Sequence, residues 1–176
     1  MSKKVRDLVL SAVIAAMYAV LTYVAAAMNL AYGPVQFRFS EAMCVLAVFT
    51  PAAIPGLTAG CLISNLASPL GIVDWICGPL ATLLAGVCTY ALRNVRLGKV
   101  RILAPLPPVL FNALIVGFEI ACLSDAGVFS FGNASFGGFL AGALSVGIGE
   151  LVVCYALGLP LIGAIERAKL DEKLHL

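Results

Sequence analysis

Residues 50–56, TPAAIPG, interrupt a long apolar block that runs from residue 40 to residue 66. Proline lacks an amide donor and its ring clashes with the preceding helical turn, so this stretch predicts a break between two short helices. Four further apolar blocks surround it, and each is close to the ~20 residues that a helix needs to cross a bilayer. They lie at residues 8–30, 75–92, 102–123 and 136–165.

The composition indicates that these blocks lie in lipid. The 176 residues are 62% hydrophobic and 11% charged, whereas soluble domains carry roughly 25% charged residues. So small a protein exposes much of its surface, and the shortage of charge therefore indicates that the surrounding solvent is lipid. We expect a single integral membrane domain over residues 1–176, a multi-pass protein of the cell membrane. The net charge of +2 gives no indication of nucleic-acid binding.

Basic residues determine the predicted topology. They gather before the first block, in one short loop and after the last block, as Lys3, Lys4 and Arg6, then Arg93, Arg96, Lys99 and Arg101, then Arg167, Lys169 and Lys173. The positive-inside rule assigns all three clusters to the cytoplasm. An even number of crossings then separates successive clusters, so residues 40–66 must cross twice. The prediction is an all-α membrane protein, a compact bundle of six transmembrane helices with cytoplasmic N- and C-termini, at roughly 8–30, 37–50, 52–70, 75–92, 102–123 and 136–165.

The two helices on either side of Pro51 are short for a full crossing. We expect either that they are embedded against neighbouring helices or that the bilayer thins around them. The pattern does not define where these two helices end.

Polar residues gather at the opposite end of the predicted bundle, in or just below the extracytoplasmic loops. Charged side chains in a membrane are expensive, roughly 2.5–3.5 kcal/mol at the bilayer centre on insertion scales, and they persist where they are paired, hydrated or functional. This set therefore supplies the candidate binding residues, which are Gln36, Arg38, Glu41, Asn65, Asp74, Trp75, Asn112, Glu119 and Glu150.

Four of these residues also have a structural interpretation. Arg38 and Glu41 are three residues apart and could form an ion pair on one helical face, with or without a role in ligand binding. Asn112 and Glu119 are seven residues apart and share a face of one helix. Asn112 could contact a ligand or form a hydrogen bond to a neighbouring helix.

The sequence favours one role for Glu150 and leaves two roles open for Trp75. No basic residue of its own helix can reach Glu150, which favours a ligand-binding role for this carboxylate. Trp75 lies at the predicted outer membrane edge, where it could belong to an interfacial aromatic belt or offer a flat surface for a planar ring.

The first helix carries a stripe of small residues on its cytoplasmic half. These are spaced i, i+3, i+4 and i+7, at Ala12, Ala15, Ala16 and Ala19. Small residues let another helix approach closely, so the stripe predicts either packing within the chain or docking of a partner.

Catalytic and nucleotide-binding motifs are missing from the sequence. It has no P-loop, no H-E-x-x-H and no G-x-S-x-G, and its one histidine, His175, is in the tail. The six cysteines lie in or beside apolar blocks and none forms C-x-x-C, so we expect buried thiols rather than metal ligands or disulfides. We therefore expect a membrane-embedded binding protein that is not an enzyme, holds no cofactor or metal, and has no energy source of its own.

Four segments resemble the queuosine-precursor transporter (QueT) family, whose members are substrate-binding S components of energy-coupling factor (ECF) transporters. The resemblance covers nearly the whole chain and is carried by VQFRFSEA (35–42), VFTPAAIPGLTAGCLISNL (48–66), GPLATLLAGVCTYALR (78–93) and APLPPVLFNALIVGFE (104–119).

The resemblance implies a fold and partners. S components are compact six-helix bundles with both termini inside and a substrate cavity near the outer face. They associate with a membrane T component and two cytoplasmic ATPase subunits, which hydrolyse ATP. In many of them an AxxxA face on the first helix docks on the T component, and here Ala12–Ala16 and Ala15–Ala19 both fit that pattern.

The resemblance also implies a 7-deazapurine substrate, such as 7-aminomethyl-7-deazaguanine or a queuine-like base. One edge of such a base carries two donors, which a single carboxylate, Glu119 or Glu150, could accept. Its aminomethyl cation would favour a second carboxylate, and its ring could stack on Trp75 or Phe37. A donor for the neighbouring carbonyl could come from Asn112, Gln36 or Arg38.

Two other interpretations of the sequence stay open. One is an S component for another vitamin or purine. The other is a small multi-span channel or structural membrane protein that needs no ATPase.

Overall fold

The computed structural model describes residues 2–31, 36–98, 100–124 and 128–170. This part of the chain is a bundle of helices without strands, and its loops hold two isolated β-bridges, Leu97–Val100 and Leu123–Phe129. The prediction of an all-α bundle is confirmed. The main helices are α1 (Lys3–Ala27), η1 (Phe39–Val48), α2 (Ala53–Asn65), α3 (Ile72–Ala91), α4 (Leu106–Ala121), α5 (Phe136–Val153), η4 (Cys154–Gly158) and α6 (Leu159–Ala168), with short 3₁₀ turns η2 (Leu92–Asn94) and η3 (Phe131–Asn133).

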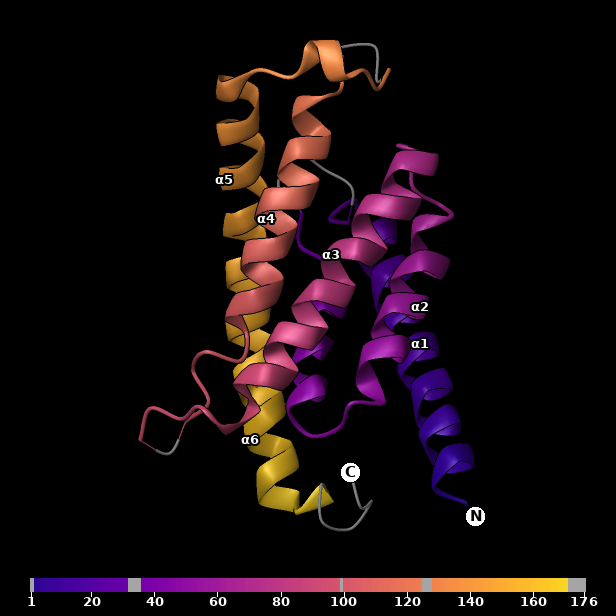
Figure 1. Ribbon diagram of the computed structural model, residues 1–176, viewed down its shortest axis with the longest axis vertical. Coiled ribbons are helices and arrows are strands. Elements are labelled where there is room, and N and C mark those ends of the chain that lie inside the picture. Colours follow the sequence, from indigo (N-terminus) through magenta and orange to yellow (C-terminus); the bar gives the residue numbers. More distant parts are fainter. Residues whose placement is uncertain (1, 32–35, 99, 125–127, 171–176) are drawn as a thin grey trace.

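The helices run up and down along the long axis of the molecule (Figure 1). Helix α2 packs against α1, α3 lies between α2 and α4, and α5 packs against α4. Helix η1 contacts α1, α2, α3, α5, η4 and α6, so it lies at the centre of the bundle. The stretch between Gln36 and Val48 is therefore the part of the chain that most of the other helices surround.

The central segment η1 is a 3₁₀ helix, where the sequence predicts a helix over 37–50 with no hint of the tighter winding. All of its residues except Phe39 and Leu46 are buried. A 3₁₀ helix rises about 2.0 Å per residue against about 1.5 Å in an α-helix, so ten residues reach about 20 Å instead of about 15 Å. The tighter winding thus lengthens a segment that is short for a crossing, and its neighbours embed it on all sides.

The apolar block 136–165 forms one long helical segment, Phe136–Ala168, in which α5, η4 and α6 follow each other directly. Its middle turn, η4, is a π-helix, a local widening that often occurs where a helix is adapted to a function. Gly158 closes this turn, and a Cβ there would lie 3.0 Å from Val45 Cγ1. The glycine therefore lets the long helix pack closely on η1.

Glycine also permits the close approach of α1 and α2. A Cβ at Gly56 would lie 2.6 Å from the Ser11 carbonyl oxygen, and one at Gly60 would lie 2.8 Å from that of Ala15. These distances leave no room for a side chain. The small-residue stripe of α1 is thus used, at least in part, for packing within the chain.

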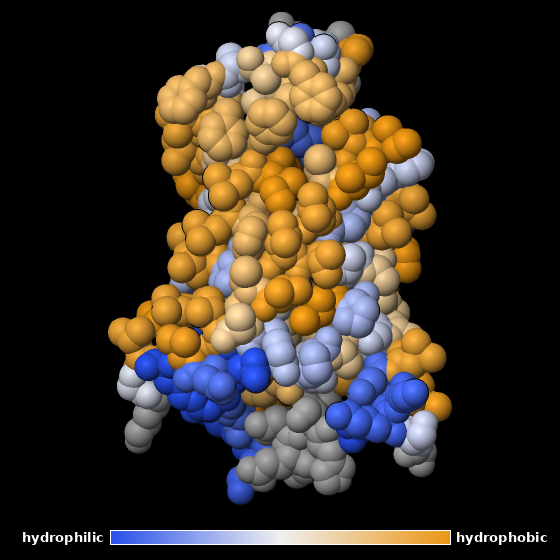
Figure 2. Space-filling view, in the orientation of Figure 1, coloured by the Kyte–Doolittle hydropathy of each residue, from blue (hydrophilic) through white to orange (hydrophobic). Residues whose placement is uncertain are grey.

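The basic residues collect at one end of the molecule. Helix α1 begins there, α6 ends there, and the loop after α3 returns there (Figure 1). Figure 2 shows the hydrophilic residues gathered at this end and an apolar surface above it. We call this region the basic end; it holds Lys3, Lys4, Arg6, Arg93, Arg96, Arg101, Arg167 and Lys169.

Three described helical segments are long and apolar enough to cross a membrane by length and composition, namely Lys3–Ala27, Ile72–Asn94 and Phe136–Ala168. Phe39–Val48 and Leu106–Ala121 are shorter apolar helices. Their outward surfaces are rich in exposed large apolar side chains, as lipid-facing surfaces are.

Candidate functional site

A buried polar network joins three helices at the end of the bundle opposite the basic end. Arg38, which precedes η1, donates from Nη2 to Asn65 Oδ1 at 2.9 Å and lies 3.5 Å from Asp74 Oδ2. Asn65, the last residue of α2, donates from Nδ2 to the Asp74 backbone oxygen at 2.9 Å and to Asp74 Oδ1 at 3.1 Å. All three side chains are buried, so the start of η1, the end of α2 and the start of α3 are held together by charge and hydrogen bonding.

The local sequence makes room for this network. A Cβ at Gly78 would lie 2.1 Å from Asn65 Nδ2, so only glycine at this position of α3 leaves space for the Asn65 amide. Asp74 lies in the first turn of α3, where the helix dipole favours a negative charge.

The sequence suggested that Arg38 could form an ion pair with Glu41. In the structure the ion-pair partner of Arg38 is Asp74. The Glu41 carboxylate is fully buried and is held by other groups. The Tyr18 hydroxyl donates to its Oε1, and Cys44 Sγ donates to its Oε2 at 3.2 Å. The Thr82 hydroxyl lies 3.3 Å from Oε1, so Glu41 ties η1 to α1 and to α3.

Three further buried residues carry polar atoms without a hydrogen-bond partner in the described part of the chain. They are both side-chain polar atoms of Asn112, both carboxylate oxygens of Glu119, and Oε1 of Glu150. The other oxygen of Glu150 accepts from Cys154 Sγ at 3.5 Å. Buried polar atoms are paired in the great majority of cases, and an unpaired one costs roughly 1–3 kcal/mol. These five atoms are therefore candidate ligand-binding groups, whereas Asp74 Oδ2, which also has no hydrogen bond, is in the ion pair with Arg38.

Two of these residues, Glu119 and Glu150, interact electrostatically with Arg38. Glu119 lies within the electrostatic reach of Asp74 and Arg38, and Glu150 lies within that of Glu41 and Arg38. Of these carboxyl groups, Asp74 is in direct contact with the Arg38 guanidinium, and Glu41, Glu119 and Glu150 interact with it electrostatically. Such an arrangement favours a ligand that carries positive charge or several hydrogen-bond donors.

An apolar pocket of about 300 Å³ lies beside Glu119. The first turns of α3, the end of α4, and two phenylalanines after α4 line it, and Glu119 is its acidic residue. The phenylalanines Phe129 and Phe131 lie edge to face, with ring centroids 5.2 Å apart. The pocket can therefore hold an apolar or aromatic group, while both carboxylate oxygens of Glu119 are buried behind its apolar wall.

The structure separates Trp75 from the rest of the predicted set. Trp75 is 36% exposed on α3, whereas the preceding Asp74 is 1% exposed and belongs to the network. Gln36 is buried, and its backbone oxygen would lie 2.0 Å from a Cβ at Gly149, next to Glu150. Gln36 thus joins the buried residues, and Trp75 lies on the surface, where a belt tryptophan is found.

The four alanines of α1 divide into two pairs. Ala15 and Ala19 are buried, while Ala12 and Ala16 are exposed. The buried pair faces the inside of the bundle, where Ala15 packs on Gly60. Within this chain, only the register Ala12–Ala16 is open to a partner.

Sequence reasoning missed Tyr18, Thr82 and Cys44. A tyrosine in the middle of an apolar helix is a usable signal, because its hydroxyl needs a partner when it is buried. Thr82 and Cys44 gave no signal, since threonine and cysteine are ordinary residues of membrane helices.

Among the residues that the structure describes, no group of three or more His, Cys, Asp or Glu side chains is arranged to hold a metal ion.

Comparison with known proteins gives one family. The family model described as QueT transporter matches residues 8–167. A relative from Lactococcus lactis subsp. cremoris (strain MG1363), named queuosine precursor transporter QueT, is 42% identical over 80 residues, which are 46% of this chain and 47% of that protein. The aligned part thus spans about half the length of this curated relative. No solved structure matches the chain. Because the family model covers nearly all of the helical bundle, the chain belongs to the QueT transporter family and is a multi-pass membrane protein.

Proposed function

We propose that this protein is the substrate-binding S component of an ECF-type importer and that it takes up a queuosine precursor, a 7-deazaguanine such as 7-aminomethyl-7-deazaguanine. The observation that carries the proposal is the set of unpaired buried polar atoms on Asn112, Glu119 and Glu150. The family match and the name of the relative support the substrate class.

The number of unpaired atoms suits the chemistry of this ligand. The guanine-like edge presents two donors, a ring N–H and an exocyclic amine, and Glu119 has two unpaired oxygens. The neighbouring carbonyl needs a donor, and the Asn112 amide nitrogen is unpaired. The aminomethyl ammonium needs one anionic acceptor, and Glu150 has one unpaired oxygen. In this arrangement Glu41 and Asp74 hold the helices in place, since their partners come from the chain itself.

The transport cycle follows from the family resemblance. The basic end would face the cytoplasm by the positive-inside rule, with the Arg38–Asn65–Asp74 network toward the outer face. A T component would dock on α1 at Ala12 and Ala16, the exposed small pair. Two ATPase subunits would supply the energy, which the chain itself has no motif to obtain. Co-purification from a strain that expresses all the components tests this part, because a channel or structural protein would be recovered without them.

The substrate assignment is tested by calorimetric titration of the purified protein with 7-aminomethyl-7-deazaguanine. Glu119→Gln replaces one acceptor oxygen by a donor that faces the donors of the base, and we expect affinity to fall about tenfold to a hundredfold. Glu150→Gln removes the charge opposite the ammonium, and we expect a similar loss. Asp7→Asn, in the surface pair Arg6–Asp7, is the matched control and should bind as the unaltered protein does.

Two results would count against this assignment. Unchanged affinity in both glutamine variants would remove the carboxylates from the site. Tighter binding of a different vitamin or purine in a competition panel would keep the S-component role and replace the substrate.

A further inference from the structure

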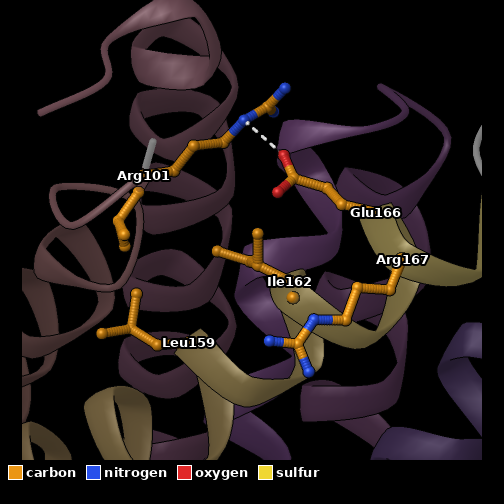
Figure 3. A pocket seen from close by; sticks show the side chains of 7 residues that line it. Arg101, Leu159, Ile162, Glu166 and Arg167 are labelled. Carbon is orange, nitrogen blue, oxygen red and sulfur yellow. Dashed lines mark ion pairs between the residues drawn. The ribbon is translucent and has the colours of Figure 1, made fainter. Parts of the chain in front are cut away.

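A second pocket lies at the basic end, opposite the end that holds the Arg38–Asn65–Asp74 network. It measures about 460 Å³ and is formed by α6 and the residues just before α4 (Figure 3). Its polar residues are Arg101, Glu166 and Arg167, and its apolar wall includes Leu159, Ile162 and Gly163. In Figure 3, Arg101 and Glu166 lie on one side of Ile162 and Arg167 lies on the other.

Among the described residues that line the pocket, positive charges outnumber negative ones. Arg101 Nε and Arg96 Nη2 approach the same oxygen of Glu166, at 3.2 and 3.3 Å. Glu166 thus contacts two guanidinium groups. Arg167 adds a third positive charge, and it forms no ion pair with another residue that the structure describes. An anion at this pocket would meet a net positive field.

The rim of the pocket has the composition of a membrane–water boundary. In the loop between α3 and α4, the exposed apolar residues Leu97, Val100 and Ile102 alternate with the basic residues Arg96 and Arg101. Figure 2 shows the hydrophilic residues of the basic end directly against the apolar surface of the bundle. A ligand in this pocket can therefore place one part among arginines and another part against aliphatic side chains.

We infer that this pocket binds the headgroup of an anionic phospholipid, with the phosphate between Arg101 and Arg167 and the start of an acyl chain along Leu159 and Ile162. Basic pockets on the cytoplasmic side of membrane helices have this chemistry. A lipid fits better than a soluble phosphate, because the wall beside the arginines includes the apolar side chains Val100, Leu159 and Ile162. The inference is independent of the substrate proposed above.

Arg101 also links the pocket to the centre of the bundle. Its guanidinium lies over the Phe49 ring, 5.3 Å from the centroid, and Phe49 directly follows η1. A headgroup held by Arg101 would therefore stiffen the base of the helix that carries Glu41.

The sharpest test fills the pocket without disturbing the fold. A Cβ at Gly163 meets no atom within 4 Å, and leucine favours a helix more than glycine does. Gly163→Leu should therefore leave the thermal stability unchanged or higher while it occupies the pocket. Native mass spectrometry of the protein in detergent, titrated with phosphatidylglycerol and with phosphatidylcholine, measures the retained lipid. We expect Gly163→Leu to abolish the preference for phosphatidylglycerol, and the matched variant Gly137→Leu, also in open space but on α5, to retain it.

A second pair of variants tests the charge. Arg167→Gln should lower phosphatidylglycerol retention roughly fivefold, as expected for one basic residue at a lipid surface. Lys4→Gln removes a charge from the same end but away from the pocket, and should change retention little.

Three results would overturn the inference. One is equal retention by Gly163→Leu and the unaltered protein, and another is equal losses in Arg167→Gln and Lys4→Gln, which would indicate diffuse surface charge. The third is binding of soluble glycerol phosphate as tightly as phosphatidylglycerol, which would indicate a site for a soluble anion.

Discussion

Arg38 and Asp74 form a buried ion pair between the start of η1 and the first turn of α3, with Nη2 and Oδ2 3.5 Å apart and both side chains 2% exposed. Asn65 bridges the two residues. A buried ion pair adds little net stability, but removal of one partner leaves the other charge buried and uncompensated. The pair therefore acts as a constraint on how η1 and α3 meet.

Asp74→Asn should strongly destabilise the bundle, because Arg38 would stay charged and buried without its counter-ion. We expect a loss of about 3–5 kcal/mol in the free energy of unfolding, measured by reversible unfolding in mixed micelles. The double variant Arg38→Met, Asp74→Asn removes both charges and should lose less than the sum of the two single variants. Strictly additive losses would mean that the two residues do not interact.

The fold could be predicted from the sequence because its signals are local. Lysine and arginine clusters mark one end of the bundle, and the prolines at 51 and 55 divide a long apolar block. The 3₁₀ winding of η1 could not be predicted, since it depends on burial of the segment by the helical segments around it.

The candidate site was only partly predictable, for a related reason. Charged and amide residues are rare in apolar helices, and this alone marked them in the sequence. All the candidate binding residues except Trp75 are buried in the structure. Their pairing was not predictable, because Arg38 could reach Glu41 along its own segment yet meets Asp74 on another helix. The burial of Ala15 and the exposure of Trp75 likewise depend on how the helices rotate against each other.

Tyr18→Phe should destabilise the protein through Glu41. The variant removes a hydroxyl that donates to a buried carboxylate, and the ring itself is preserved. Hydrogen bonds to charged groups are worth about 1.5–3 kcal/mol, and we expect a loss in this range in thermal or mixed-micelle unfolding.

The matched control is Tyr23→Phe, on the same helix. Its hydroxyl donates to the Ile63 carbonyl at 3.0 Å in an exposed position, so its loss should cost at most about 1 kcal/mol. Equal effects of the two variants would contradict a special role for the Tyr18–Glu41 contact.

Ala16→Phe should separate transport from binding. Ala16 is exposed on α1, away from the polar network, so the variant should fold and bind 7-aminomethyl-7-deazaguanine with unchanged affinity. If the T component docks on the exposed pair Ala12–Ala16, the phenyl ring would prevent the close approach that small residues permit. Uptake of radiolabelled substrate by cells should then fall at least about tenfold. The control Ala141→Phe puts the same ring on an exposed alanine of α5 and should transport normally. Normal uptake by Ala16→Phe would rule out docking at this register, because a bulky ring cannot be accommodated where two helices touch through alanines.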